Sequence, residues 1–569
     1  MSQSRFERID GVDYYTIDGA ERLAEFFMSA VSSGEHWMFI SSMGALTAGR
    51  RDAEGALFPY ETVDKVMAGK AHTGSRTRIL VSEGGSNATW DPFADWTSAV
   101  WPLTRSVSKA KTGHLIRFEE RNLSLRLAFG YSWGFSSRYG FVRKAFIRNE
   151  GDAARRIVII DGLYNLMSGG VTRRLQDRYS CLSDAYKDNV LDPETGLAAY
   201  SLASAITDRA EPREALKASA AWSVGLHGRK LSLSRDELGP DGAFIAGAPR
   251  TRALGQKGDY ILRAELELAP GASESWYIVA DVGLDHAALA DLRGELRRDG
   301  GLMAERLEAE RKATGEELEA VLGAVDGLSA GELPMHEWHH AANALFNAMR
   351  GGYPVGGMRV DPADLVGFIR GRNRAAGERA AALLEGAAGA DGRVGRDEAM
   401  ALLASAGSPD LARLAREYVP LSFSRRHGDP SRPWNEFSIR VRDASGAPVL
   451  DYQGNWRDIF QNWEALGRSY PAYLESFIAL FLDATTVDGY NPYRISRTGL
   501  DWEREDPEDP WSNIGYWNDH QLIYLQKLVE SYEAHFPGAL AASLEERRYS
   551  WADVRSEERR VGKECRSRW

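Results

Sequence analysis

The residues best suited to chemistry gather between Arg425 and Gln521, where flat aromatic side chains alternate with planar polar ones. The aromatic residues are Trp434, Trp456, Trp463, Trp502, Trp511, Trp517, Tyr452, Tyr490, Tyr493 and Tyr516. The polar residues among them include Arg457, Asp458, Gln461, Asn462, Glu464, Asp488, Asn491, Arg494, Asn513, Asn518, Asp519 and His520. Sugars present apolar C–H faces and a rim of hydroxyls, so a carbohydrate site needs aromatic platforms beside hydrogen-bonding groups. The region therefore predicts a carbohydrate site, and an aromatic helical core is the alternative interpretation.

The segment GNWRDIFQNWEAL, residues 454–466, is the sharpest unit within this region. Its glycine and asparagine predict a turn, and the residues after them predict a helix. Arg457 and Gln461 are four positions apart, so they share one face of that helix. An arginine beside Asp458 could grip vicinal hydroxyls while its fork holds the carboxylate in place. We therefore expect Trp456, Arg457, Asp458 and Gln461 to contact a sugar; a helix-start ion pair is the structural alternative.

Three carboxylates combine a setting suited to sugars with a position near a helix start: Asp458, Glu464 and Asp519. Inversion at a glycosidic bond needs one carboxylic acid to protonate the leaving oxygen, while water or phosphate attacks from the opposite face. We assign Asp458 to binding. Asp519 is then the best candidate for the acid or base, followed by Glu464.

A zinc-peptidase pattern occurs once, as His336-Glu337-Trp338-His339-His340. Histidines four residues apart on a helix can chelate zinc while the glutamate acts as a base. No further glutamate motif follows, and the segment HHAANALF lacks the glycine and third histidine of the extended pattern. A zinc peptidase using His336, Glu337 and His340 is therefore the remote alternative, and the site we prefer needs no metal or organic cofactor.

Composition limits the partners. The chain has 569 residues, a net charge of −11 and two cysteines. That charge argues against a nucleic-acid partner, because phosphate binding needs a basic face. No apolar run is long enough to span a membrane, and the first residues contain no apolar core of a signal peptide. With so few cysteines we expect a cytoplasmic protein. The oligomeric state is left open, a homo-oligomer included.

The spacing of apolar residues changes along the chain. Before residue 285, short alternating segments separated by turn residues predict strands at 36–40, 77–81, 115–119, 124–129, 140–149, 155–160, 260–268 and 275–279. After residue 334, helical spacing predicts helices at 335–350, 362–369, 375–384, 396–406, 409–417, 457–466, 470–482 and 519–535. The fold class is thus β followed by α. We expect a large antiparallel β-sandwich over 1–284, a helical linker over 285–333 and a helical domain over 334–554.

Several of these segments resemble a known family. GNWRDIFQNWEALGRSYP, and the later DATTVDGYNPYRI and WSNIGYWNDHQLIYLQKLVE, are similar to segments of (α/α)6-barrel enzymes of the cellobiose-phosphorylase type. FGYSWGFSSRYGFVRKAFIRNEGD resembles strands of the β-supersandwich that precedes such barrels. The resemblance implies a glycoside phosphorylase or hydrolase acting on an oligo- or polysaccharide, with inorganic phosphate as a co-substrate. Arg457 and Asp458 would hold the non-reducing sugar, and Tyr490, Asn491, Arg494 and Trp517 of the adjoining loops are further candidate substrate-binding residues.

The chain also departs from that family. Asn462 and Trp463 stand near the position of a second aspartate, and the downstream aspartate loop that supplies the general acid is missing. We therefore expect a truncated (α/α)6 barrel, possessing sugar-binding residues and lacking its catalytic acid. Residues 555–569, RSEERRVGKECRSRW, resemble a sequencing artefact. A non-catalytic carbohydrate-binding or scaffold protein is the alternative function.

Overall fold

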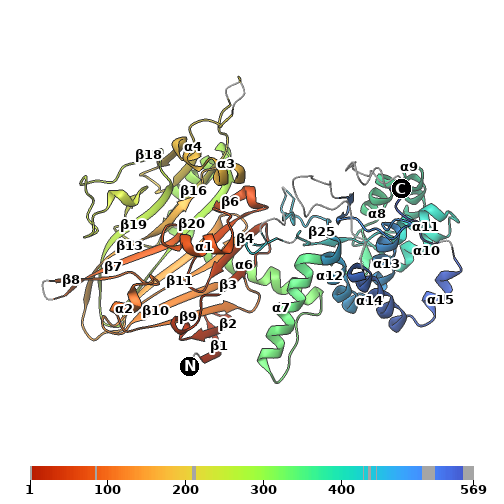
Figure 1. Cartoon of the computed structure of the whole chain (residues 1–569), viewed down its shortest axis with the longest axis horizontal. Coiled ribbons are helices and arrows are strands. Elements are labelled where there is room, and N and C mark those ends of the chain that lie inside the picture. Colours follow the sequence, from red (N-terminus) through yellow and green to blue (C-terminus); the bar gives the residue numbers. More distant parts are fainter. Residues whose placement is uncertain are drawn as a thin grey trace. The chain divides into compact units, whose positions relative to one another are not determined.

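The computed structural model describes residues 3–83, 86–207, 210, 213–426, 428–432, 437–443, 445–502, 519–546 and 548–554. Its contacts divide the chain into two compact units. A β-sandwich unit contains Met1–Glu319 and Gly428–Phe437, and a helical unit contains Ala320–His427 and Ser438–Trp569. Figure 1 shows the elements of each unit. The predicted borders 1–284, 285–333 and 334–554 stay a prediction, and the predicted tail 555–569 lies outside the described residues.

The β-sandwich unit is built around an eleven-stranded sheet, counted over the described residues. In spatial order its strands are β1(Gln3–Ile9), β2(Val12–Asp18), β9(Leu103–Ala110), β10(Ile116–Asn122), β11(Leu127–Ser136), β12(Gly140–Asn149), β20(Ser273–Leu284), β16(Ala218–Val224), β15(Ala198–Leu202), β14(Lys187–Leu191) and β18(Arg252–Leu254). Each pair of neighbouring strands in this sheet is antiparallel. The predicted large antiparallel sheet is therefore present.

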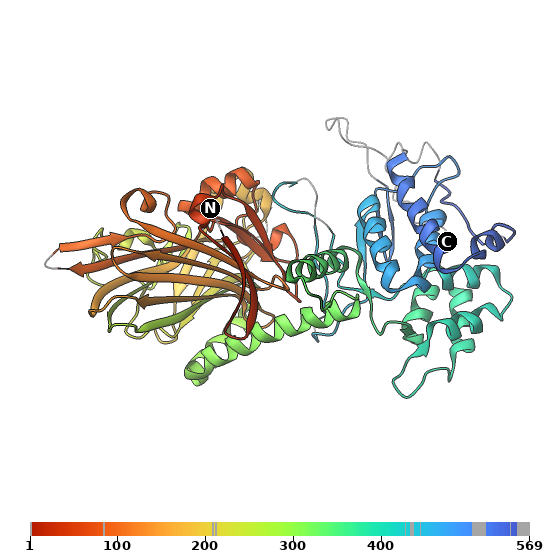
Figure 2. The ribbon, with the colours of Figure 1, turned by 90° about the horizontal axis from the view of Figure 1, so that it is seen from below.

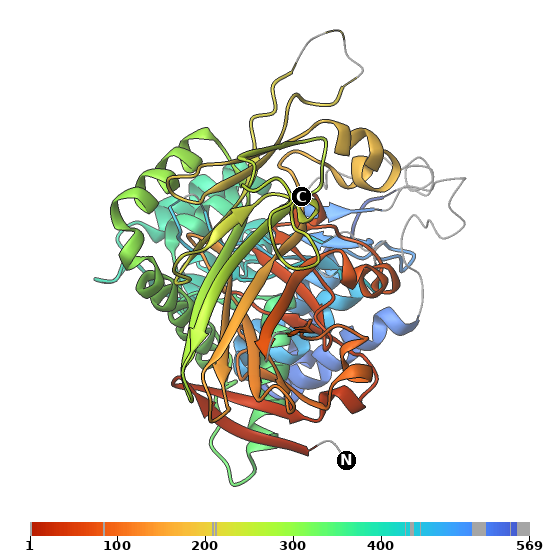
Figure 3. The same ribbon diagram turned by 90° about the vertical axis from the view of Figure 1, so that its left-hand side faces the viewer.

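Two smaller sheets accompany the large one within the described residues. One has five strands in the order β17(Lys230–Ser232), β19(Gly258–Leu268), β13(Arg155–Leu166), β7(Gly74–Glu83) and β8(Ser86–Trp90). The other has four: β3(Phe27–Ala30), β4(His36–Ser41), β5(Leu46–Arg50) and β6(Ala56–Phe58). One apolar core joins all three sheets and includes Ile79, Phe129 and Trp276. Figure 3 shows the strands of this unit from another side.

Helices complete the β-sandwich unit. Four are short, namely α1(Val63–Ala68), α2(Thr97–Val100), α3(Arg173–Arg178) and α4(Ser180–Ala185). Two longer ones, α5(His286–Asp299) and α6(Met303–Ala324), follow the last strand. Leu289 of α5 and Met303 and Leu307 of α6 pack against Trp222 and Val279 of the large sheet, and Figure 2 shows these light-green helices. Every residue of β11 is buried, and Arg311 and Thr314 of α6 donate to Ser132 Oγ and the Phe135 carbonyl of this strand.

The helical unit consists of paired helices joined by loops and small antiparallel ladders. Its helices are α7(Pro334–Gly351), α8(Pro362–Arg372), α9(Arg374–Leu384), α10(Arg396–Ala404), α11(Pro409–Arg416), α12(Trp456–Ser469), α13(Leu474–Asp483), α14(Asp519–His535) and α15(Ala539–Leu544). Its strands pair as β21(Tyr353–Pro354) with β24(Leu421–Ser422), β22(Arg359–Val360) with β23(Val394–Gly395), and β25(Gln453–Asn455) with β26(Arg494–Ser496) and β27(Gly499–Asp501). The predicted (α/α)6 barrel stays a prediction.

Local signals explain where these helices begin. Proline occupies an opening position of α7, α8 and α11, where a missing N–H costs nothing. Asp361 caps α8 by accepting from the Ala363 and Asp364 amides. Among the described residues, no helix is both long and apolar enough to cross a membrane.

Two elements were predicted to begin several residues too early. The strand predicted at 124–129 is β11, which begins only at Leu127, because Arg126 adopts a left-handed φ of 52° in the turn before it. The helix predicted at 470–482 is α13, which begins at Leu474, because Pro471–Tyr473 form a separate 3-10 turn. Both errors assign turn residues to the neighbouring element.

Candidate functional site

The first turn of α12 is held in place by the small ladder that precedes it. Asn455 of β25 lies opposite Arg494 of β26, and the Trp456 amide donates to the Tyr493 carbonyl at 2.9 Å. The loop that begins near Tyr490 is thereby joined to the start of the helix. Two predicted segments, 454–466 and 490–494, are thus brought together, as a sugar site would need.

An aromatic core fixes the inward face of α12. Trp456 and Phe460 lie against Phe481 of α13, with ring centroids 5.1 and 4.9 Å away. Trp463 stacks on Phe477 at 4.8 Å and an interplanar angle of 13°, and its Nε1 donates to the Gly351 carbonyl at 2.8 Å. These contacts leave the helix little freedom to rotate or slide.

The outward face of α12 carries the predicted polar residues. Arg457 and Gln461 are exposed. Arg457 Nε lies 3.7 Å from Asp458 Oδ1, and the two side chains are 46% and 19% exposed. An aspartate in the first turn is also favoured by the partial positive charge of the helix N-terminus. A guanidinium and a carboxylate therefore stand side by side on a rigid helix, where both can reach a ligand.

The other predicted binding residues differ in how deeply they are buried. Trp456 is 1% exposed and Asn491 is 1% exposed, so neither is open to a ligand, and the predicted sugar contacts of both are not supported by this structure. Asn491 instead donates to Thr485 Oγ1 at 2.8 Å. Arg494 donates from Nε to Asp501 Oδ2 at 2.5 Å. Tyr490 is half-buried. Trp517 lies outside the described residues.

The aromatic residues that suggested stacking platforms divide in the same way. Tyr452, Trp463 and Trp502 are 1%, 0% and 7% exposed, so they are core residues. Trp434, Trp511 and Tyr516 lie outside the described residues. For the buried members, the alternative interpretation of an aromatic core is the correct one. A helical period cannot by itself distinguish an inward tryptophan from one that faces a ligand.

Of the two predicted catalytic carboxylates, the structure describes the side chain of Glu464 alone. Glu464 is 22% exposed, and its Oε2 accepts from Lys527 Nζ of α14 at 3.3 Å. This ion pair gives Glu464 a structural partner of its own. Asp519 begins α14, and its side chain lies outside the described residues.

The zinc alternative gains no support from the residues that the structure describes. His340 Nε2 lies 2.6 Å from the Asp326 carbonyl, and Glu337 Oε1 accepts from the Gly331 amide at 2.5 Å. No group of three or more histidine, cysteine, aspartate or glutamate side chains is placed to hold a metal within the described part of the chain. The helix predicted around this motif is confirmed as α7.

One arrangement in the helical unit has no counterpart in the predictions. Glu417, after α11, and Asp483, at the end of α13, are 0% and 2% exposed. Burial, together with the neighbouring Asp483 charge, raises the pKa of Glu417 to about 8, although Arg413 lies beside it. Burial also raises the pKa of Asp483. This pair cannot touch a substrate, so its role is structural, and no local sequence signal shows which helix ends meet.

Comparisons with known proteins give structural likeness only. No family model matches the chain, and no curated protein matches it. A bacterial glucoamylase solved with acarbose has a TM-score of 0.36 and 11% identity, over 93% of this chain and 69% of its own. A protein assigned as a kojibiose phosphorylase from the human microbiome has a TM-score of 0.24 and 8% identity, over 91% and 50%. A GalM/aldose epimerase homologue from C. elegans has a TM-score of 0.27 and 10% identity, over 46% and 100%. At these TM-scores, the likeness transfers no activity to this chain.

Proposed function

We propose that this chain is a carbohydrate-active protein that binds an oligo- or polysaccharide at the start of α12 and acts on its glycosidic bonds. The observation that carries the proposal is the Arg457–Asp458 pair, of which Arg457 is exposed and Asp458 partly exposed. It lies at the start of a helix whose other face is locked by Trp456, Phe460 and Trp463. A rigid helix that presents a charged pair is the arrangement that precise recognition of hydroxyl groups needs.

Each group of the pair has a distinct task. The Asp458 carboxylate accepts hydrogen bonds from two neighbouring sugar hydroxyls, and the Arg457 guanidinium donates to a hydroxyl or ring oxygen. Gln461, one turn along on the same exposed face, adds a donor and an acceptor. Tyr490 enters from the loop that β26 joins to β25. Bond cleavage then needs a proton donor, for which Asp519 is the first candidate and Glu464 the second, and either water or inorganic phosphate as the nucleophile.

A non-catalytic carbohydrate binder is the second candidate. The observation that favours it is the Glu464–Lys527 ion pair, which occupies one of the two candidate acids. A binder would use Arg457 and Asp458 in the same way and would release no sugar.

Binding is tested with three variants of the full chain. Arg457→Ala and Asp458→Asn should each weaken binding of an oligosaccharide selected from a glycan array by about tenfold or more, because a charge-assisted hydrogen bond contributes about 1.5–3 kcal/mol. Arg468→Ala is the matched control, since Arg468 is exposed on the last turn of the same helix. Isothermal titration calorimetry measures all three. Equal affinities for the two test variants and the control would overturn the proposal.

Catalysis is tested separately from binding. The protein is incubated with the bound oligosaccharide in the presence and absence of inorganic phosphate, and released sugar and sugar phosphate are measured. Release that Asp519→Asn abolishes and Glu464→Gln leaves unchanged supports an enzyme with Asp519 as its acid. Binding without release identifies the non-catalytic binder.

A further inference from the structure

A cleft lies within the β-sandwich unit, beside strand β7. Its volume is about 380 Å³, within the size range of small-molecule sites. Thr77 and Ile79 of β7 are buried toward the core, so Arg76 and Arg78, which alternate with them, lie on the opposite face of the strand. The cleft is lined on that face by Arg76, Arg78, Lys70, Arg235, Tyr164 and Trp96.

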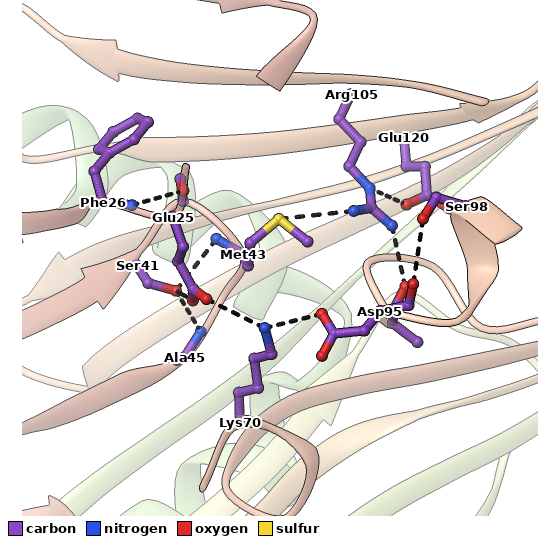
Figure 4. Close-up of polar contacts among 12 residues, drawn as sticks. Glu25, Phe26, Ser41, Met43, Ala45, Lys70, Asp95, Ser98, Arg105 and Glu120 are labelled. Atoms are coloured by element: carbon purple, nitrogen blue, oxygen red, sulfur yellow. Dashed lines mark hydrogen bonds and ion pairs between the residues drawn. The ribbon is translucent and has the colours of Figure 1, made fainter. Parts of the chain in front are cut away.

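Three of the four cations in this cleft are neutralised by carboxylates of the protein. Arg78 forms two hydrogen bonds of 2.9 Å with Asp91. Arg235 donates to Asp259 at 2.8 and 2.9 Å and lies over the Tyr164 ring at 4.2 Å. Lys70 Nζ lies 2.9 Å from Asp95 Oδ1 and 3.2 Å from Glu25 Oε2, as Figure 4 shows.

Arg76 is the exception. Among the described residues, no carboxylate lies within ion-pair distance of its guanidinium, and its buried Nε has no hydrogen-bond partner. Burial lowers the pKa of Arg76, although Asp91 and Asp95 of the same cleft act in the opposite direction. An arginine remains charged in proteins, so this guanidinium can pair with an anion that enters the cleft.

Hydrogen bonds hold the loop that carries the aromatic residues Phe93 and Trp96 of the cleft. Phe93 has a left-handed φ of 63°, and its amide donates to Glu120 Oε2 at 2.9 Å. Arg105 donates to the same carboxylate at 2.6 Å (Figure 4). It also donates to the Ala94 carbonyl at 3.2 Å. A strained non-glycine residue persists only where its surroundings over-determine it. The loop therefore holds Trp96, which is 43% exposed, at the mouth of the cleft.

We propose that this cleft binds a small anionic sugar, with the acidic group on Arg76 and the sugar ring against Trp96. An arginine fork pairs with a carboxylate or a phosphate through two parallel hydrogen bonds, and an indole face suits the apolar side of a sugar ring. Lys70, Arg78 and Arg235 are each paired with carboxylates of the protein, which leaves Arg76 as the point of attachment. This site is independent of the one on α12, so either can fail without the other.

Four probes identify the chemistry that the cleft selects. Glucuronate and glucose 6-phosphate carry the carboxylate and the phosphate on a sugar, glucose lacks the acid, and inorganic phosphate lacks the sugar. By calorimetry we expect at least one anionic sugar to bind about tenfold or more tightly than both glucose and inorganic phosphate. The preferred acid then identifies the ligand class. Glucose or inorganic phosphate binding as tightly as both anionic sugars would overturn the proposal.

Variants place that binding in the cleft. Arg76→Met should weaken the preferred anionic sugar at least tenfold and leave glucose unaffected. Trp96→Ala should weaken the same ligand severalfold. Arg156→Met is the matched control, because Arg156 is an exposed arginine on β13 of the same sheet and does not line the cleft. Unchanged affinity in both Arg76→Met and Trp96→Ala would overturn the proposal.

Stability separates a ligand site from a structural role. Because the Nε of Arg76 is already unsatisfied, Arg76→Met should leave the unfolding midpoint unchanged or raise it. If the unfolding midpoint of Arg76→Met is lowered, that variant cannot separate a ligand site from a structural role. The affinity of Trp96→Ala, whose indole is exposed, is then the test. Unweakened binding in Trp96→Ala would then overturn the assignment.

Discussion

The β-sandwich unit and the helical unit both bury carboxyl groups, and they neutralise them in different ways. In the sandwich, Asp161 is 0% exposed and receives Arg143 at 2.7 and 2.9 Å and the Trp276 Nε1 donor at 2.7 Å. Glu120 is likewise buried between Arg105 and the Trp90 Nε1 donor, each at 2.6 Å. Each of these carboxylates has an arginine directly against it, so its negative charge is balanced by a permanent positive one.

The helical unit places two carboxyls together instead. Arg413 Nη1 donates to Glu417 Oε1 at 2.5 Å, and the Ser550 amide donates to Asp483 Oδ1 at 2.6 Å. The other oxygens of the pair, Glu417 Oε2 and Asp483 Oδ2, are buried and have no other donor among the described residues. A proton held between the carboxyls satisfies both oxygens. The sandwich thus depends on fixed charges, and this part of the helical unit depends on a proton.

The largest effect is expected when a buried, arginine-paired carboxylate of the sandwich is removed. Asp161→Ala leaves Arg143 buried without its carboxylate and leaves the Trp276 Nε1 donor unpaired, so the free energy of unfolding should fall by about 3–5 kcal/mol. Urea unfolding followed by tryptophan fluorescence measures it. Glu267→Ala is the control, because Glu267 is 63% exposed and lies 3.7 Å from Arg156, and surface changes of this kind stay within about 0.5 kcal/mol. Similar losses in both variants would show that the buried pair is not special.

These buried groups also show how far sequence alone could go. The strand at Gly140–Asn149 was predicted with its observed ends, and the helices over 362–384 and 409–417 were predicted nearly so, because period and turn residues are local signals. The pairing of Arg143 with Asp161 joins two strands of different sheets, and that of Glu417 with Asp483 joins two helices. Neither follows from spacing along the chain.

The same distinction between local signals and packing applies to the candidate site. The exposed pair Arg457 and Asp458 was predicted from its place at a helix start, and the structure puts it there. Trp456, the residue before it, was predicted to contact a sugar and is buried. Successive side chains of a helix point about 100° apart around its axis. The packing of α13 against α12 therefore decides which of these neighbouring residues faces inward.

The second prediction concerns the proton shared by Glu417 and Asp483. In the unfolded chain a glutamate releases its proton near pH 4.3, whereas folded Glu417 keeps it until about pH 8. Between these values the folded protein holds the extra proton, so the free energy of unfolding should fall as the pH rises through this window. Glu417→Gln mimics the protonated side chain and should flatten that fall. Urea midpoints from pH 5 to 9 measure it, and equal slopes in both proteins would contradict the shared proton.

The smallest effect lies at the opposite end of the pH scale, in the sandwich. A hydrogen bond from Arg293, supported by Thr195, lowers the pKa of Asp192 to about 2. Since the unfolded pKa is higher, this carboxylate stabilises the fold above about pH 4, and the contribution is lost as the pH falls toward 2. Asp192→Asn should therefore lower the free energy of unfolding slightly at pH 8, and the two proteins should converge as the pH falls toward 2. Because Arg293 is 49% exposed, the difference should also shrink at high salt. A difference that remains at pH 2, or that does not shrink in high salt, would mean that the sandwich gains from Asp192 through packing. The contrast with the proton-dependent pair of the helical unit would then rest on the buried ion pairs alone.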